Sequence, residues 1–557
     1  MRTYFISSNL ITAKLVSDQI SESLTSSSGL THVIVMPRKL LSIEKLLEEE
    51  GLAGYVELHE FAWEFIPIDD DILSLELPSV LRTQYLCGDL SYLPTVARAI
   101  WGLKSIFGNI PNILSVGKNA KRLAKLEQQF TNHYGQYRQH GGDIGSLFIF
   151  ERDMDWASCL LSPLTYEGLL DETFGITCGQ VEFGPEVTKS EASAKLQLSS
   201  MDKMFDKIRN KHFASIFTVL GVTAKQLSNV QAAASNMNVS QMKQFVANNL
   251  RDMKAQSKAV ALHISASEAI QREKGGHFEK QLPVEHELVS GANYKENVSY
   301  IEDCMALLKP LTIPLRLICL LSHCNDGLVI ADYQRLKTQF VQAYGFQHLV
   351  TWNNLLKAGI IRVRGGISQI TSLTSLKPTE AANAAVTRMA GLVGTGANNR
   401  ANFQQIVKKL NCAPADTSLT EPNNAAYVFN GAYTPLACRI VEETLKCNGH
   451  LTNSPLGEAL KMLPGEPVIQ WSGDTSNKVR QAVTSVVWLQ WVITCHRMSL
   501  LTICDVFQVT LVLFVGGYTM AEVAALRWLQ TVTGHQIMVA GTGLTGGNKI
   551  ISDMERL

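Results

Sequence analysis

The sequence predicts an α/β plus α protein with more than one domain. Strand-like apolar segments at residues 3–9 and 31–37 alternate with helical segments, the clearest of which is Leu40–Gly51. Alternation of this kind indicates a parallel sheet covered by helices. Between about Lys195 and Ile270 the strand patterns disappear and amphipathic helical patterns dominate. The 557 residues also exceed what one hydrophobic core usually serves, so we expect about two to four domains.

Further helical patterns lie at Leu93–Ile106 and Asn119–Phe130, within a region from Asp71 onward that we expect to be mainly helical. A charged loop then follows the most strand-like run of the chain. Leu147–Phe150 is apolar and aromatic, and the next five residues carry four charges. Ligands of open α/β sheets gather at the carboxyl ends of strands, and Mg²⁺ prefers oxygen ligands. One hypothesis is therefore a metal-dependent hydrolase that uses Glu151, Asp153, Asp155 and Asp171.

The alternative for this loop is structural. Buried charges are tolerated when they are paired, so Arg152 would be the internal counter-ion of its neighbouring carboxylates. Glu167 and Asp171 belong to the same group because their spacing places both on one face of a helix. The predicted structural charge cluster comprises Arg152, Asp153, Asp155, Glu167 and Asp171.

Composition favours protein partners over other kinds. Fifty basic and fifty acidic residues cancel, so the chain has no electrostatic footprint for nucleic acid or an anionic membrane. The eleven cysteines include no C-x-x-C pair and form no cluster with histidine at ligand spacing, which argues against a zinc site and a disulfide scaffold. The first residues do not resemble a signal peptide. These features predict a cytoplasmic protein without a metal or cofactor.

Two glycine-rich segments resemble nucleotide motifs without meeting their requirements. Residues 391–396 follow no strand and lack the Gly-Lys-Ser/Thr ending, and we expect the whole of 364–424 to be a surface excursion. Later, a strand at 510–515, a helix at 520–529 and a strand at 535–540 lead into Gly541–Gly546. That is a literal G-x-G-x-x-G, but the chain offers no later strand and acidic residue for a dinucleotide.

Residues around the charged loop are similar to the signature of a known family. The runs are Arg152-Asp153-x-Asp155, Ser162-Pro163-Leu164 and Thr165–Asp171-Glu172, supported by segments at 69–78, 181–188 and 300–304. They resemble the Sec/Munc (SM) family, which holds and templates SNAREs during membrane fusion. The second group of segments resembles its class C vacuolar-sorting branch, and 181–188 resembles the B-type paralogue of that branch. The family is not known for chemistry at this loop.

The resemblance implies an SM-type arch of two α/β domains with a large helical domain inserted in the second. Residues 1–70 would be a partial first domain that lacks its opening helix and first strand, and we expect it to be unstable. Residues 71–192 and 425–557 would form the second domain, with a return at 427–436 and a helix at 437–445, and 193–424 the helical third domain.

The resemblance also implies a function without enzymatic activity. The protein would bind SNARE helices within a class C-type tethering complex, at late endosomal and lysosomal membranes reached through partners, and small GTPases would act on it indirectly. The helical segment 241–263 would present the SNARE-binding residues, which are Lys243, Gln244, Arg251, Lys254 and Lys258. Phe346 and Leu349 would bind an α-solenoid partner. A second possibility is an adaptor that binds only that solenoid.

Residues 479–508 match nothing in the family pattern. The segment is strongly apolar, but charges leave at most about fifteen residues between them, short of the ~20 that span a membrane. It begins Val-Arg and ends Phe-Gln, which GTA-AGA and TTT-CAG can encode, and these triplets have the form of splice ends. We hypothesise a retained intron, which transcript reads across the locus would test. If translated, it would form an aggregation-prone apolar patch.

Overall fold

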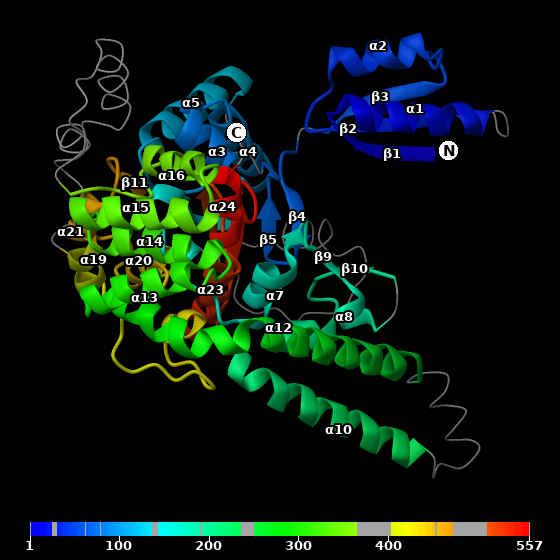
Figure 1. The fold of residues 1–557 in the computed structure, drawn as a ribbon. Helices are drawn as coiled ribbons and strands as arrows, with labels where there is room; N and C mark the ends of the chain where they lie inside the picture. Colours follow the sequence, from blue (N-terminus) through cyan, green and yellow to red (C-terminus); the bar gives the residue numbers. More distant parts are fainter. Residues whose placement is uncertain are drawn as a thin grey trace. The chain divides into compact units, whose positions relative to one another are not determined.

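The computed structural model describes residues 2–24, 30–61, 63–77, 80–135, 143–189, 192–234, 250–364, 403–451, 454–471 and 509–555. They form two compact units, shown with the element labels in Figure 1. The first unit comprises Met1–Ile66, Ser91–Asn109 and Leu123–Gly141. The second comprises Pro67–Leu90, Ile110–Arg122 and Gly142–Leu557. The predicted insertion at 479–508 and the glycine-rich segment at 391–396 lie outside the described residues.

The first unit contains a parallel three-stranded sheet in the order β1-β2-β3. Its elements are β1 (Arg2–Ser7), α1 (Leu10–Leu24), β2 (Thr31–Met36), α2 (Leu41–Glu49) and β3 (Val56–Glu60). One face of the sheet packs with both helices through a small core that includes Ile6, Val33 and Val35. The strands predicted at 3–9 and 31–37 and the helix at 40–51 are confirmed.

Helices α4 (Leu93–Phe107) and most of α5 (Ala120–Tyr134) complete the first unit. The nearly buried Lys104 ammonium lies 3.1 Å from the Glu127 carboxylate, which joins the two helices. The helices predicted at 93–106 and 119–130 are confirmed.

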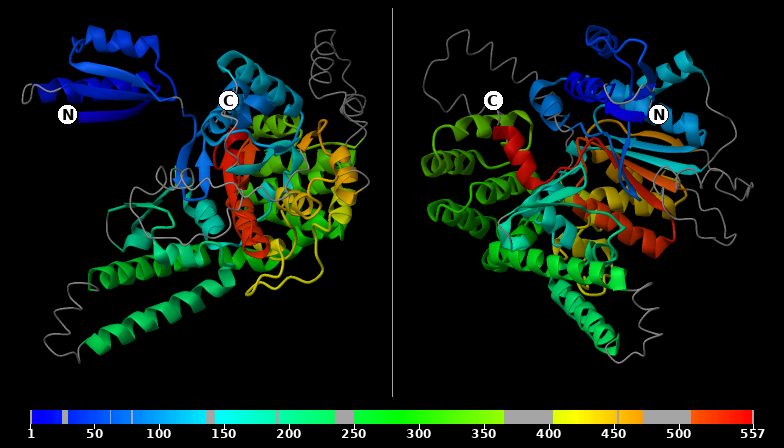
Figure 2. Two further views of the ribbon diagram at one scale, coloured as in Figure 1. Left: turned by 180° about the vertical axis from the view of Figure 1, so that it is seen from behind. Right: turned by 90° about the vertical axis from the view of Figure 1, so that its right-hand side faces the viewer.

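The second unit is built on a seven-stranded sheet in the order β11-β6-β7-β12-β13-β5-β4. Its strands are β4 (Ile66–Asp69), β5 (Ile72–Ser74), β6 (Asn112–Val116), β7 (Ile144–Glu151), β11 (Val468–Trp471), β12 (Val509–Val515) and β13 (Ile537–Gly541). Strand β12 lies parallel to β7 on one side and to β13 on the other. Segments far apart in sequence therefore share one sheet, as when Val539 of β13 pairs with Ile72 of β5, and the right-hand view of Figure 2 shows this sheet. We expected the region from Asp71 onward to be mainly helical, but it contains strands β5 and β6 as well as helices, so that expectation is wrong in part.

Shorter elements surround this sheet. The helical ones are α3 (Val80–Arg82), η1 (Thr83–Cys87), η2 (Arg152–Met154), α6 (Ala157–Leu160), α7 (Tyr166–Phe174), α8 (Pro185–Thr188), η4 (Ala425–Phe429), α20 (Leu436–Lys446), α21 (Pro455–Met462), α23 (Met520–Thr533) and α24 (Gly547–Glu555). A small antiparallel sheet consists of β8 (Ile176–Thr177), β9 (Gln180–Phe183) and β10 (Ala194–Gln197). The strands and helices predicted at 510–515, 520–529, 535–540 and 437–445 are confirmed.

Most of the remaining second unit is helical, as predicted, although β10 lies at the start of the region where we expected no strand. The helices are α9 (Lys203–Ile208), η3 (Phe213–Ser215), α10 (Ile216–Ala234), α12 (Leu250–Ser290), α13 (Tyr294–Ala306), α14 (Thr312–Cys324), α15 (Ile330–Tyr344), α16 (His348–Lys357) and α19 (Phe403–Lys409). Helix α14 is buried along most of its length, where it contacts α6, α12, α13 and α24.

The expectation of a surface excursion over 364–424 is wrong for residues 403–410, whereas residues 413–424 are irregular and none of them is buried, as expected. Phe403, Ile406, Val407 and Leu410 have helical spacing, and all four are buried in the main core. The prediction overlooked this short apolar stripe because the surrounding sequence is rich in small and polar residues. Among the helices of the described residues, none has the length and apolarity needed to cross a bilayer.

Candidate functional site

The charged loop after β7 contains a buried ion pair that joins distant parts of the second unit. The Arg152 guanidinium, 1% exposed, donates two hydrogen bonds to the Glu522 carboxylate at 2.8 and 2.9 Å. Glu522 lies in the first turn of α23, where it also accepts from the backbone and side chain of Thr519 in a capping box. The end of β7 is thereby fixed to the start of the helix that follows β12.

The glycine turn after β12 makes this pairing possible. A Cβ on Gly516, whose φ is +95°, would lie 2.8 Å from the Arg152 Cβ. The Arg152 guanidinium also donates to the Gly517 carbonyl at 3.3 Å and to the Asp155 carbonyl at 2.6 Å. Only a residue without a side chain lets the two strand ends approach so closely.

The expected pairing of Arg152 with its neighbouring carboxylates is wrong, because each carboxylate has another partner. Asp155 accepts from Ser158 and from the Leu436 backbone N–H. Glu167 binds Arg527 at 2.8 Å, and Arg527 also binds Asp71 through two nitrogens. Asp171 binds Lys549 at 2.8 Å, and Asp153 lies 3.2 Å from Lys118. Three cations outside the predicted cluster, Lys118, Arg527 and Lys549, thus pair with Asp153, Glu167 and Asp171 respectively.

Glu151 is the loop residue with the most unusual acidity. Burial and the nearby Asp153 raise its pKa to about 8, while hydrogen bonds from Asn119 oppose the shift. The Asn119 backbone N–H donates to its carboxylate at 2.6 Å, and Gln84 donates at 3.3 Å. A carboxyl group with such a pKa would suit a general acid.

The other members of the proposed hydrolase site do not join Glu151. Asp155 and Asp171 are occupied by the hydrogen bonds and ion pair given above. Within the described ranges, the only group of three or more potential metal ligands is His32, Glu57 and His59, outside this loop. The carboxylates therefore do not form the metal site that the hydrolase hypothesis requires.

Residues of the family-like signature anchor the helical region instead. Ser162 donates through its backbone and hydroxyl to Glu285 of α12, at 2.9 and 2.7 Å. Arg316 of α14 binds Glu172 of α7 at 2.9 Å and the Leu160 carbonyl at 3.0 Å. Thr165 caps α7 by accepting from the Gly168 N–H. The residues of the family-like signature therefore hold the helical region against the part of the chain that follows β7.

Helices α10 and α12 run side by side in Figures 1 and 2 and contact one another. Lys254 and Lys258 are exposed on α12. His263 is fully buried at the inner part of this helix, where it binds Tyr166 at 2.9 Å and Asp202 at 3.2 Å. Of the other SNARE-binding candidates, Lys243 and Gln244 lie outside the described residues, and Arg251 is described only as part of the α12 backbone.

Phe346 is 82% exposed in the turn between α15 and α16, and Leu349 lies beside it at 37%. Under this turn, Phe340 packs against Tyr344 and Trp352 with ring centroids 4.9 and 5.8 Å apart. The Tyr344 hydroxyl also donates to the Lys309 carbonyl at 2.6 Å. That bond holds the turn beside the connection that carries Leu307 and Leu308, which are both exposed. The sequence analysis did not identify these two leucines.

The Gly541–Gly546 segment lies between β13 and α24, as a dinucleotide motif would. Its first glycine, however, serves close packing. A Cβ on Gly541 would lie 2.4 Å from the Tyr518 ring, and the Tyr518 N–H donates to the Gly543 carbonyl at 3.0 Å. The space over the first glycine is thus filled by the protein's own side chain.

Comparisons with known proteins cover almost the whole chain. The model of the Sec1 family matches residues 2–553. The human vacuolar protein sorting-associated protein 33B is 34% identical over 530 residues, which cover 94% of this chain and 82% of that protein. The rat protein 33A is 30% identical, with coverages of 93% and 80%. A chain in the crystal structure of the Unc18–syntaxin 1 complex from Monosiga brevicollis has the same fold, with a TM-score of 0.65 at 14% identity. The match covers 100% of this chain and 88% of that chain.

Replacing Arg152 tests the buried ion pair. Arg152→Met leaves the Glu522 carboxylate buried without its counter-ion, so we expect a loss of about 3–5 kcal/mol in the free energy of unfolding. Arg152→Met/Glu522→Gln should recover part of that loss, because glutamine is uncharged and still suits the capping box. Chemical denaturation of the two variants and the wild type measures both effects; equal stability of the single and double variants would contradict the role of charge.

Glu151 should make stability depend on pH in a defined direction. Its pKa is about 8 in the folded protein and 4.5 as a free group, so the folded state binds more protons between these values. Stability should therefore fall as pH rises from about 5 to 8, by on the order of a few kcal/mol from this group. In Glu151→Gln this contribution is absent. Thermal unfolding of both proteins across that pH range tests the prediction, and parallel curves would refute it.

Proposed function

Because this chain belongs to the Sec1 family, we propose that it binds SNARE helices within a class C-type tethering complex during vesicle docking and fusion at late endosomes and lysosomes. The family assignment makes the protein a trafficking regulator and not an enzyme. It therefore overturns the hydrolase hypothesis, in agreement with the separate partners of the loop carboxylates.

The helical pair of α10 and α12 is the observation that carries SNARE binding. Helix α12 has 41 residues, which corresponds to about 60 Å of helix, and Pro283 lies in its last third. Recognition of one helix by others needs such a long, solvated surface and no reactive group. The Unc18 protein in the related structure forms a complex with syntaxin 1, which supports the same class of partner for this chain.

A rigid pair of helices would act by lowering an entropic cost. SNARE segments that are disordered before assembly lose conformational freedom when they align. A surface that holds the SNARE segments in register restricts their conformations before they assemble, so less conformational entropy remains to be lost in assembly. The inner end of α12 is fixed by His263 and Glu285, so the scaffold is preorganised for that task.

The exposed apolar turn supports a second contact, with an α-solenoid subunit of the tethering complex. Phe346, Leu349, Leu307 and Leu308 are exposed, and the bond from Tyr344 to the Lys309 carbonyl joins the two segments that carry them, so we call these four residues the Phe346 patch. An aromatic residue held by a packed turn and flanked by aliphatic residues has the character of a binding hot spot. An adaptor that binds only the solenoid remains the second candidate, since the same patch supports it.

Capture experiments separate these two candidates. The full chain is mixed with purified cytoplasmic regions of SNAREs and, separately, with the α-solenoid subunit. We expect capture of both. Capture of the solenoid without any SNARE would favour the adaptor and would overturn SNARE binding.

Charge reversal on α12 tests the SNARE-binding surface. We expect Lys254→Glu/Lys258→Glu to weaken SNARE binding about tenfold, because both cations would be replaced by charges that repel an acidic partner. Lys295→Glu/Lys461→Glu is the matched control, with the same charge change at exposed sites on α13 and α21. Surface plasmon resonance provides the affinities. An equal loss in both double variants would indicate a general effect of net charge.

Substitution of Phe346 tests the solenoid contact. Phe346→Asp should weaken solenoid binding by about 2 kcal/mol or more, roughly thirtyfold, and leave SNARE capture unchanged. Met201→Asp is a suitable control, since Met201 is 81% exposed at a site outside the Phe346 patch. Unchanged solenoid affinity in Phe346→Asp, with circular dichroism identical to the wild type, would exclude this residue as a hot spot.

A further inference from the structure

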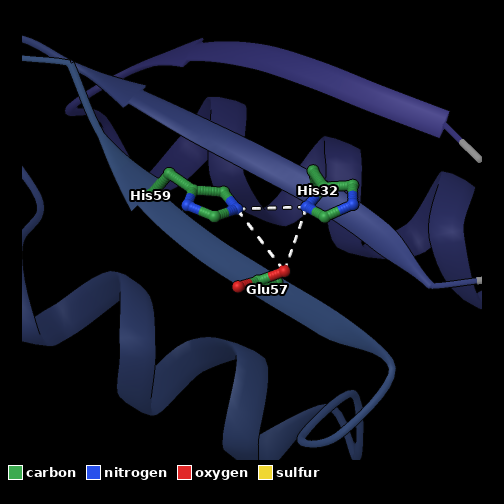
Figure 3. Close-up of side chains that lie close together, drawn as sticks. All are labelled: His32, Glu57 and His59. Carbon is green, nitrogen blue, oxygen red and sulfur yellow. Dashed lines mark hydrogen bonds and ion pairs between the residues drawn. The ribbon is translucent and has the colours of Figure 1, made fainter.

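Three potential metal ligands converge in the first unit, and none of them is used for the proposed function. They are His32 on β2 and Glu57 and His59 on β3, and Figure 3 shows their side chains together. The sequence analysis found no histidine cluster at ligand spacing. His32 is 25 residues from Glu57, so only the pairing of the two strands reveals the group.

The register of the sheet places all three side chains on one face. His32 lies opposite Glu57, and Ile34 lies opposite His59, so Glu57 and His59 are the next two residues along the same side of β3. Val33 and Val35 alternate with His32 and point into the core formed with α1 and α2. The group therefore rests on two hydrogen-bonded strands whose opposite face is packed, which is a rigid support for a site.

The ligand atoms have the separations expected around one ion. The Nδ1 of His32 lies 3.0 Å from the Nε2 of His59 and 3.2 Å from the Oε2 of Glu57, and the remaining pair is 3.7 Å apart. Ligands at about 2.05 Å from Zn²⁺ in a tetrahedron are separated by ~3.3 Å, which falls within this range. Without an ion, the two imidazoles share one hydrogen bond between His32 Nδ1 and His59 Nε2, whereas the distance of 3.7 Å between His59 and Glu57 exceeds hydrogen-bond length.

We propose that His32 Nδ1, His59 Nε2 and Glu57 Oε2 bind a divalent transition-metal ion of the Zn²⁺ class. Two imidazoles and one carboxylate suit zinc and exclude the hard cations Mg²⁺ and Ca²⁺, which need oxygen ligands. Each imidazole then carries its proton on the ring nitrogen that faces away from the ion.

A fourth coordination position faces solvent in this arrangement. The side chains of His32, Glu57 and His59 are 20, 53 and 42% exposed, so the face of the sheet on which they lie is open. Three protein ligands with an open position form an accessible site rather than a closed structural one. Water would occupy that position until another donor replaces it. The ion would also join β2 to β3 through their side chains.

Zinc titration of the full chain tests the site. Isothermal titration calorimetry with ZnCl₂ in a non-chelating buffer gives the number of bound equivalents for the wild type, His59→Asn and Glu57→Gln. We expect His59→Asn to bind one equivalent fewer and Glu57→Gln to bind that equivalent at least tenfold more weakly. The control is His286→Asn, which removes an exposed histidine of α12 and should bind as the wild type does.

Comparing zinc binding by the wild type and the three variants decides whether the proposed ligands bind the ion. The exposed thiols of Cys87 and Cys178 contribute equally to all four proteins, so a difference in binding between the variants and the wild type reports on His59 and Glu57. Circular dichroism checks that the variants fold, and Glu57→Gln is the conservative change at the most exposed ligand. Equal stoichiometry and affinity in the wild type and both ligand variants would overturn the proposal.

Discussion

The buried pair of Arg152 and Glu522 is the interaction on which the second unit depends. It connects residues 370 positions apart in sequence, at the end of β7 and the start of α23. Because Glu522 also completes the helix cap and Gly516 admits the guanidinium, strand, turn and helix are determined together. A charged pair with so little exposure contributes specificity more than net stability, since its desolvation offsets much of its attraction.

The same loop supports the helices on which we propose binding surfaces. Ser162 and Glu172 lie between this loop and the end of α7, and they fix α12 and α14 through Glu285 and Arg316. The charged residues in and after the loop, which first resemble an active site, therefore attach the long helices to the sheet. Such an arrangement suits a protein that aligns other helices, because a bound helix can be positioned only as precisely as the helices that hold it.

Local patterns in the sequence predict much of this fold and little of its pairing. The apolar runs at 147–150 and 510–515 and the helix at 520–529 are evident because their periodicity is local. The partner of Arg152 is not, since no local signal links it to Glu522, and the same holds for Arg527 and Lys549. Short strands such as β6 and β11 carry too few residues for a clear pattern. The group around His32 needs the register of two strands, which spacing alone does not reveal. Phe346 and Leu349 could be singled out beforehand only through the family resemblance, and their aromatic support only through the structure.

The strand order of the large sheet has a consequence for how the protein is made. Strands β12 and β13 lie at its centre, between β7 and β5, yet they are synthesised last among its strands. Until they leave the ribosome, β6 with β7 and β4 with β5 are separate pieces with open edges, which are prone to wrong pairing. A nascent chain must therefore keep these edges covered for most of its translation. A premature stop before residue 509 removes both central strands rather than trimming an end.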